Sequence, residues 1–216
     1  MSMRLRETLD EMKRQFEAST PLEAQTALYG LIRAQQASAK PFGLQVGEKA
    51  KDFALTDANG REVSLYEQLS SGPVVLTFYR GGWCPYCSRQ LRAYQQVLPR
   101  IEALGARLMA VSPQGPDQTL SQAEKDELRF HVLSDRHGLV AASYRILYDV
   151  PEDVQAVLQQ GFGLDLAEYN ATDRWILPVP STFMIDESGI VRSAYVNPDF
   201  MQRFEPDDII SELSKL

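Results

Sequence analysis

The only two cysteines of this chain, Cys84 and Cys87, are separated by two residues. A cysteine becomes a nucleophile and a redox group once its thiol ionises. Two thiols three positions apart on a helix lie on one face, within bridging distance of each other. One sulfur can then attack a substrate, and the other can resolve the covalent product as an intramolecular disulfide. We therefore expect dithiol redox chemistry.

These cysteines stand where a buried strand turns into a helix. Residues 74–78 (VVLTF) form an apolar, β-branched run that predicts a buried strand, and the glycines at 81–82 end it. Apolar residues at helical spacing follow Cys87, and Pro85 suits the first position of a helix. The first turn of a helix offers unpaired N–H groups and positive dipole charge. We expect this end to lower a cysteine pKa from its free value of about 8.5.

Two buried structural cysteines, or half of a zinc site, are the alternatives to a redox pair. A structural zinc ion takes about four ligands, and the two histidines, His131 and His137, lie in a different segment. The sequence therefore predicts neither a metal nor another cofactor.

Composition narrows the class of protein. The 216 residues, 44% hydrophobic and 24% charged, are typical of a soluble globular domain with an appendage. A net charge of −7 argues against nucleic acid or an anionic membrane as partner. No apolar run reaches the length of a membrane span, and the N-terminus lacks the apolar segment of a signal peptide. A single CxxC with no other cysteines suits a reducing compartment, so we expect a cytoplasmic protein.

Residues 1–43 are predicted to form an N-terminal helical extension, and residues 44–216 the main domain. Apolar residues at helical spacing between 5 and 16, and again between 28 and 32, indicate a helical hairpin over residues 3–38. We expect this hairpin to pack on its own domain, the alternative being a partner subunit in a homodimer.

Strands and helices alternate along the main domain, which indicates an α/β fold of two or three layers. Helices are expected at 117–129, exposed to solvent, and at 138–146, with Leu139, Ala142 and Ile146 facing inward. Residues 181–196 form a β-hairpin pattern. The pattern loosens between about 149 and 177, which we interpret as an insertion.

Several short patterns together resemble the thioredoxin fold, and more closely its peroxiredoxin branch, the alkyl hydroperoxide reductase and thiol-specific antioxidant proteins. They are Gly47-x-x-Ala50-x-Asp52-Phe53, Ser134-Asp135 followed by Ala141-x-x-Tyr144, and Phe183-x-Ile185-Asp186-x-x-Gly189-Ile190. The resemblance runs from about residue 46 to 196. It implies a central mixed sheet flanked by helices, preceded here by the helical extension.

The active-site segment departs from the usual peroxiredoxin pattern, Pro-x-x-x-Thr/Ser-x-x-Cys. Aligning Cys87 with the reactive cysteine puts Arg80 at the proline and Cys84 at the hydroxyl residue. The arginine that the family places just before the late strand has no counterpart in residues 179–182. Cys-Pro-Tyr-Cys is instead similar to dithiol glutaredoxins, and Pro180 resembles the cis-proline that lies beside the CxxC of thioredoxins.

The resemblance implies a thiol peroxidase that reduces hydrogen peroxide or organic hydroperoxides. Cys87 would attack the peroxide to give a sulfenic acid, Cys84 would condense with it, and a thioredoxin- or glutaredoxin-type dithiol would reduce the disulfide. Arg80, Arg89 and Arg92 are candidates for the missing arginine, although each is expected on the solvated surface.

Two alternatives remain. In a protein disulfide oxidoreductase, Cys84 at an exposed helix tip is the nucleophile, Cys87 resolves, and Pro180 positions a disulfide substrate. In a redox-sensing interaction module, the helical hairpin responds to the state of the CxxC. Supporting or substrate-binding roles are expected for Trp83, Pro85, Tyr86, Arg80, Pro180 and Ser181. We favour the peroxidase because the resemblance extends over the whole domain.

Overall fold

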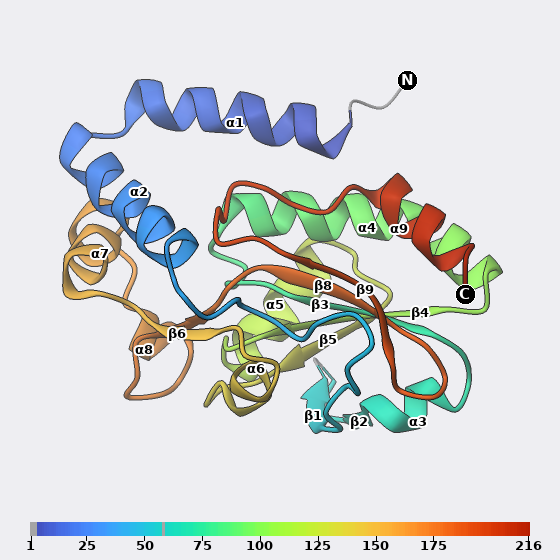
Figure 1. The fold of residues 1–216 in the computed structure, drawn as a ribbon. Coiled ribbons are helices and arrows are strands. Elements are labelled where there is room, and N and C mark those ends of the chain that lie inside the picture. Colours follow the sequence, from blue (N-terminus) through green and yellow to red (C-terminus); the bar gives the residue numbers. More distant parts are fainter. Residues whose placement is uncertain (1–3, 58) are drawn as a thin grey trace.

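A mixed β-sheet forms the centre of the computed structural model, which describes residues 4–57 and 59–216 (Figure 1). Within these residues the sheet has seven strands in the order β2-β1-β5-β4-β3-β8-β9. The strands are β1 (Ala54–Asp57), β2 (Glu62–Ser64), β3 (Val74–Phe78), β4 (Arg107–Ser112), β5 (His131–Ser134), β8 (Ser181–Ile185) and β9 (Val191–Val196). The three strands β3, β4 and β5 run parallel, and the outer pairings are antiparallel. The predicted central mixed sheet flanked by helices is confirmed.

Helices cover both faces of this sheet, so its central strand β3 is buried throughout. On one face lie α4 (Pro85–Ala103), α5 (Pro116–Lys125) and α9 (Pro206–Leu213), with Val75 pointing toward them. On the other lie α3 (Leu65–Leu69) and α6 (Leu139–Ser143), against Val74, Leu76 and Phe78. The alternation of sides along β3 follows from the two-residue repeat of a strand.

The predicted N-terminal helices are α1 (Leu5–Ser19) and α2 (Leu22–Gln36). Helix α1 packs across α4, and Leu5 and Leu9 on its inner side are buried. Helix α2 descends beside α7 (Glu152–Ala156) and the π-helical turn η1 (Val157–Gly161), as Figure 1 shows. The two helices therefore connect the active-site helix to the insertion.

The insertion is closed at its base by a short ladder that the sequence pattern does not reveal. Strand β6 (Leu147–Asp149) pairs antiparallel with β7 (Ile176–Pro178). Between them lie α7, η1 and α8 (Leu166–Tyr169). Strands of three residues, one ending in proline, are too short to produce a periodic signal.

The prediction of the inward face at 138–146 is wrong for two of its three residues, whereas Ile146 is buried as expected. In α6, Leu139 is 70% exposed and Ala142 is also exposed, whereas Val140 and Ala141 are buried. This helix has only five residues, so a shift of its start by one position turns a different face inward. Helix α5 exposes most of its residues, as expected, and buries Thr119 and Gln122.

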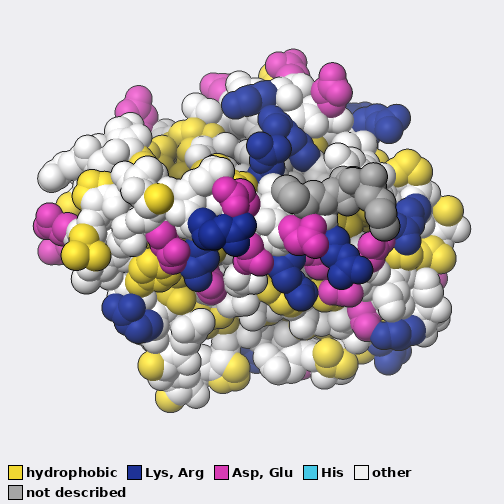
Figure 2. Space-filling view, turned by 90° about the horizontal axis from the view of Figure 1, so that it is seen from above, with side chains coloured by type: hydrophobic (Ala, Val, Ile, Leu, Met, Phe, Trp, Pro, Cys, Tyr) yellow, Lys and Arg dark blue, Asp and Glu magenta, His cyan; other side chains and the backbone are white. Residues whose placement is uncertain are grey.

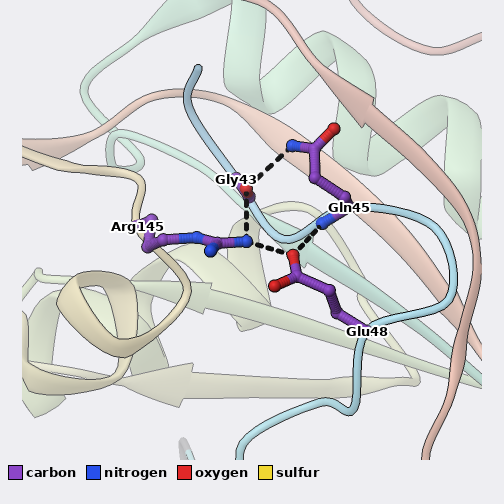
Figure 3. Close-up of polar contacts among 4 residues, drawn as sticks. All are labelled: Gly43, Gln45, Glu48 and Arg145. Carbon is purple, nitrogen blue, oxygen red and sulfur yellow. Dashed lines mark hydrogen bonds and ion pairs between the residues drawn. The ribbon is translucent and has the colours of Figure 1, made fainter. Parts of the chain in front are cut away.

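A polar cluster fixes the segment that leads from α2 into the sheet (Figure 3). The guanidinium of Arg145 donates to the Gly43 carbonyl oxygen and pairs with the Glu48 carboxylate. Glu48 also accepts the backbone N–H of Gln45, and this bond, with the Arg145 side chain, lowers the pKa of Glu48. The cluster joins this segment to the turn after α6.

Acidic and basic side chains are interleaved on the side of the molecule that carries α1 (Figure 2). In the described part of the chain, no helix combines the length and the apolar composition needed to cross a bilayer.

Candidate active site

The two cysteines lie at the carboxyl end of β3, at the start of α4. Cys84 occupies the N-cap position and Pro85 the first turn, as the sequence predicts. The neighbouring strand β8 begins at the same level, because Phe78 is paired with Ser181 in the sheet register. The site is therefore held between a central strand, its neighbour and the N-terminus of the longest helix described.

Both thiols are free and buried, with Cys84 1% and Cys87 0% exposed. The expectation that Cys84 stands at an exposed helix tip is therefore wrong. The reason is that Tyr86, Trp83, Phe200 and the N-terminal helices pack around it. Cys84 instead lines a cavity of about 190 Å³. Cys84 is therefore the sulfur-bearing residue next to the cavity, and Cys87 lies behind it.

The side chain of Arg203 lies directly against the sulfur of Cys87. One guanidinium nitrogen of Arg203, Nη2, donates to Cys87 Sγ at 3.3 Å. Burial by itself raises the pKa of Cys87, but the hydrogen bond with Cys84 and the charges of Arg203 and Arg80 outweigh it. The pKa of the Cys87 thiol therefore lies well below its ordinary value. The thiolate form of Cys87 is therefore favoured.

The pKa of Cys84 is shifted in the opposite direction. Burial, followed by the hydrogen bond and negative charge of Cys87, raises the pKa of the Cys84 thiol well above its ordinary value. The two thiols are thus shifted in opposite directions, with the ionised form favoured at Cys87 over Cys84. The helix N-terminus does not lower both pKa values, because a buried pair of neighbouring sulfurs shares one negative charge.

A chain of buried polar side chains orients Arg203. Its Nε donates to Gln90 Oε1 at 2.6 Å, and Gln90 Nε2 donates to Thr77 Oγ1 at 3.1 Å. Thr77 Oγ1 lies 3.0 Å from Thr182 Oγ1 across the β3–β8 pair. The guanidinium of Arg203 also donates to the carbonyl oxygens of Phe200 and Gln202. These bonds hold the cation against the sulfur through both the sheet and α4.

Of the three arginines proposed to replace the family's arginine, Arg80 is buried, at 2% exposed. The expectation that it is solvated is therefore wrong. Its guanidinium carbon lies 4.7 Å from the ring centroid of Trp83 and 4.1 Å from that of Phe200. Such stacking stabilises a cation out of water. Arg89 is exposed, and Arg92 pairs with Asp126, so the structure does not bring these two to the sulfurs.

The glycine turn between β3 and α4 is held by hydrogen bonds to buried side chains. Gly82 N donates to Gln114 Oε1 at 2.8 Å, while Gln114 Nε2 donates to the Tyr79 hydroxyl and to Gln122 Oε1. A side chain at Gly81 (φ +145°) would place its Cβ 2.5 Å from the Trp83 indole nitrogen. Glycine is required there to let the indole lie close to the backbone.

The remaining predicted residues occupy different places around the site. Trp83, the exposed Pro85 and the buried Tyr86 line the cavity beside Cys84. Pro180 and Ser181 are buried at the start of β8 and do not line this cavity. The resemblance of Pro180 to a cis-proline is not confirmed, because every peptide bond in the described ranges is trans.

Sequence reasoning missed Arg203 and Gln90. Arg203 is 116 residues from Cys87 and belongs to the segment between β9 and α9, where no local pattern marks it. The position of Gln90 in the sequence could have indicated its role. It lies three residues after Cys87, on the face of the helix that is otherwise apolar, where a polar residue needs a partner.

Comparisons with known proteins show the family of this chain. A family model described as the AhpC/TSA family matches residues 46–194. The chain belongs to the AhpC/TSA family. It is accordingly an oxidoreductase of the thiol peroxidase class, and the resemblance inferred from the sequence is confirmed. Arg203 and both N-terminal helices lie outside the matched residues.

Individual members of the family and related proteins are distant. Peroxiredoxin Q, chloroplastic, from Sedum lineare is 29% identical over 79% of this chain and 76% of its own length. The thiol-disulfide oxidoreductase ResA from Geobacillus thermodenitrificans is 28% identical over 74% of this chain and 76% of its own length. The crystal structure of peroxidoxin BcpB from Mycobacterium tuberculosis aligns with a TM-score of 0.64 at 21% identity, covering 80% of this chain and 98% of that one. This structure shares the fold.

Proposed function

We propose that this AhpC/TSA protein reduces hydroperoxides with Cys87 as the attacking sulfur and Cys84 as the resolving one. The observation that carries the assignment is the Arg203–Cys87 hydrogen bond of 3.3 Å. Only a thiolate is an effective nucleophile toward peroxide. The two buried guanidinium groups favour that thiolate at Cys87, whereas the pKa of Cys84 is raised.

The chemical steps use the two sulfurs, the peroxide and an external dithiol. The Cys87 thiolate attacks the terminal peroxide oxygen, the O–O bond breaks, and the departing alkoxide or hydroxide takes up a proton. Cys87 is then a sulfenic acid. Cys84 attacks its sulfur, a disulfide forms and water leaves. An external dithiol returns both sulfurs to the reduced state by exchange. Arg203 and Arg80 favour the reaction by stabilising negative charge at the buried sulfurs.

A second candidate function is reduction of protein or small-molecule disulfides, with Cys84 attacking first. The observation that favours this function is that Cys84 lines the cavity, whereas Cys87 does not. The similarity to a thiol-disulfide oxidoreductase also supports it. The raised pKa of Cys84 argues against this function, because it disfavours the Cys84 thiolate that would attack the disulfide.

Two serine variants distinguish these functions. If the protein is a peroxidase, Cys87→Ser should not react with hydrogen peroxide. Cys84→Ser should still complete one turnover, to a sulfenic acid that a dione reagent traps. If the protein is a disulfide reductase, Cys84→Ser should no longer reduce a model disulfide. The intact protein should then react with peroxide no faster than an ordinary thiol does. Stopped-flow mixing of the reduced protein with peroxide measures the first property directly. A wild-type rate no faster than a free thiol contradicts the peroxidase assignment.

For the reductant we propose a thioredoxin- or glutaredoxin-type dithiol, and for the compartment a reducing one such as the cytoplasm. The single CxxC, with no structural disulfide, supports a reducing compartment. Microscopy of a fluorescent fusion tests the location. Rates with purified thioredoxin and glutaredoxin as sole reductants identify the partner class.

A further inference from the structure

Two arginines near the sulfur pair are buried, Arg203 at 4% and Arg80 at 2% exposed. No ion pair in the described part of the chain includes either of them. The carboxylate of Asp199, which lies in the same region, is half-buried and accepts a backbone N–H. Burial lowers the pKa of Arg203, but negative charge on Cys87 and Cys84 outweighs it. The negative charge that balances the buried cations is therefore that of the reduced sulfurs.

Oxidation of the sulfur pair removes this negative charge. A disulfide between Cys84 and Cys87 is neutral, whereas in the reduced pair the ionised form of Cys87 is favoured. In the reduced protein Arg203 Nη2 donates to Cys87 Sγ at 3.3 Å, but a sulfur without charge is only a weak acceptor. A buried charge that loses its partner is strongly destabilising. The surroundings of the pair therefore stabilise the dithiol relative to the disulfide.

The covalent link itself adds little stability to the oxidised protein. In the chain-entropy account, a disulfide stabilises a fold by closing a loop of the unfolded chain, and the gain grows with the length of that loop. Only Pro85 and Tyr86 separate the two cysteines, so this gain is small. The electrostatic contribution of the arginines then decides the balance, and a disulfide whose reduced form is stabilised is a strong oxidant.

We propose that the Cys84–Cys87 disulfide is strongly oxidising, because its reduction restores a negative partner to Arg203 and Arg80, and that the oxidised protein therefore transfers its disulfide to thiols, monothiols included. The proposal goes beyond the peroxidase assignment, since it concerns the dithiol–disulfide equilibrium and holds whichever sulfur meets the peroxide first.

The transfer takes two exchange steps. A thiolate attacks Cys84 Sγ, the Cys84–Cys87 bond breaks, and Cys87 leaves as a thiolate beside Arg203. A second thiolate attacks the external sulfur of the mixed disulfide, the two external thiols leave as a disulfide, and Cys84 takes up a proton. Two electrons thus pass from the thiols to the protein. Cys84 is the sulfur attacked because it lines the cavity and because Cys87, with its lowered pKa, is the better leaving group.

The first test is the equilibrium of the full-length protein with 2-mercaptoethanol and its disulfide at pH 7. Both reagents are small and uncharged, which suits the apolar cavity, and every protein thiol counted belongs to the pair because the chain has two cysteines. Arg203→Met is expected to shift the equilibrium constant at least about tenfold toward the disulfide, which is about 30 mV for this two-electron couple. Arg80→Met should shift it in the same direction.

Arg89→Met is the matched control, because it removes an exposed arginine from the same helix as Cys87, and should leave the equilibrium constant unchanged. Circular dichroism verifies folding, and if Arg203→Met does not fold, Arg80→Met decides. An equilibrium constant that the deciding variant leaves at the wild-type value would overturn the proposal.

The second test needs no arginine variant. Unfolding and reduction form a closed thermodynamic cycle, so a fold that makes the disulfide oxidising must stabilise the reduced protein more than the oxidised one. Denaturant unfolding of both forms at pH 7 measures this difference. We expect the larger unfolding free energy in the reduced form, the reverse of the usual effect of a disulfide. A more stable oxidised form would contradict the proposal and leave the peroxidase assignment standing, because peroxide kinetics are measured on the reduced protein.

Discussion

Arg203 Nη2 donates a hydrogen bond to Cys87 Sγ at 3.3 Å, joining two residues 116 positions apart in the chain. Burial lowers the pKa of Arg203, but the charges of Cys87 and Cys84 and the hydrogen bond to Cys87 outweigh it, so that pKa is raised. The arginine therefore remains charged at every pH at which the thiolate can act. Each member of the pair favours the ionised form of the other, as linkage requires.

Replacing Arg203 by methionine should raise the pKa of Cys87 and slow its reaction with peroxide. A hydrogen bond to a charged group contributes about 1.5–3 kcal/mol, so the acid dissociation constant of Cys87 should fall by about tenfold or more. Thiolate ultraviolet absorbance followed against pH measures the shift. Arg89→Met, which removes an exposed arginine from the same region, is the control and should leave the titration unchanged.

The pH dependence should distinguish a serine from an alanine at position 84. Because the pKa of Cys87 is lowered, its peroxide reactivity should persist as pH falls below the free-thiol value of about 8.5, and be lost only below the folded pKa. Cys84→Ser keeps a hydroxyl donor to the thiolate, whereas Cys84→Ala removes it. The midpoint of the pH–rate profile should therefore lie higher in Cys84→Ala than in Cys84→Ser. Identical midpoints would show that the Cys84 hydrogen bond does not contribute.

Gln90→Glu should impair the site without unfolding the protein. The new carboxylate accepts the Arg203 Nε–H that Gln90 now accepts at 2.6 Å. It then competes with the Cys87 thiolate for one guanidinium, which raises the pKa of Cys87. We expect a peroxide rate constant lower than that of the wild type at pH values near the shifted pKa, and restored as the pH rises above it. Gln96→Glu, an exposed glutamine on the same helix, adds the same charge and should have no such effect.

Gly81→Ala should destabilise the turn that carries the cysteines. The position combines a φ of +145° with a Cβ position 2.5 Å from the Trp83 indole nitrogen. Backbone strain alone costs about 1–3 kcal/mol, and the displaced indole adds to it. Denaturant unfolding measures the loss. Gly105→Ala separates the two causes, because Gly105 has φ +76° but open space around its Cβ. A loss no larger at Gly81 than at Gly105 would exclude the steric contribution.

Much of the fold could be predicted from local pattern. The apolar run at 74–78, the glycine pair and the proline after Cys84 specify a strand, a turn and a helix start, and the structure has all three. These predictions are correct because each depends only on residues that are close together in the chain. The buried faces of helices α5 and α6 could not be predicted in the same way. Helix α6 has five residues and α5 few apolar ones, so neither gives a periodicity that fixes its buried side.

The sequence by itself determined that this protein has a pair of thiols at the start of a helix on an α/β sheet. It also determined the family, because the order of short motifs is a property of the chain. Only the tertiary structure decided which sulfur is ionised. That depends on Arg203, which reaches the site from a distant segment, and on Arg80, which is buried between Trp83 and Phe200. A pKa reflects the charges and the solvent around a group in space, and neither follows from the spacing of residues along the chain.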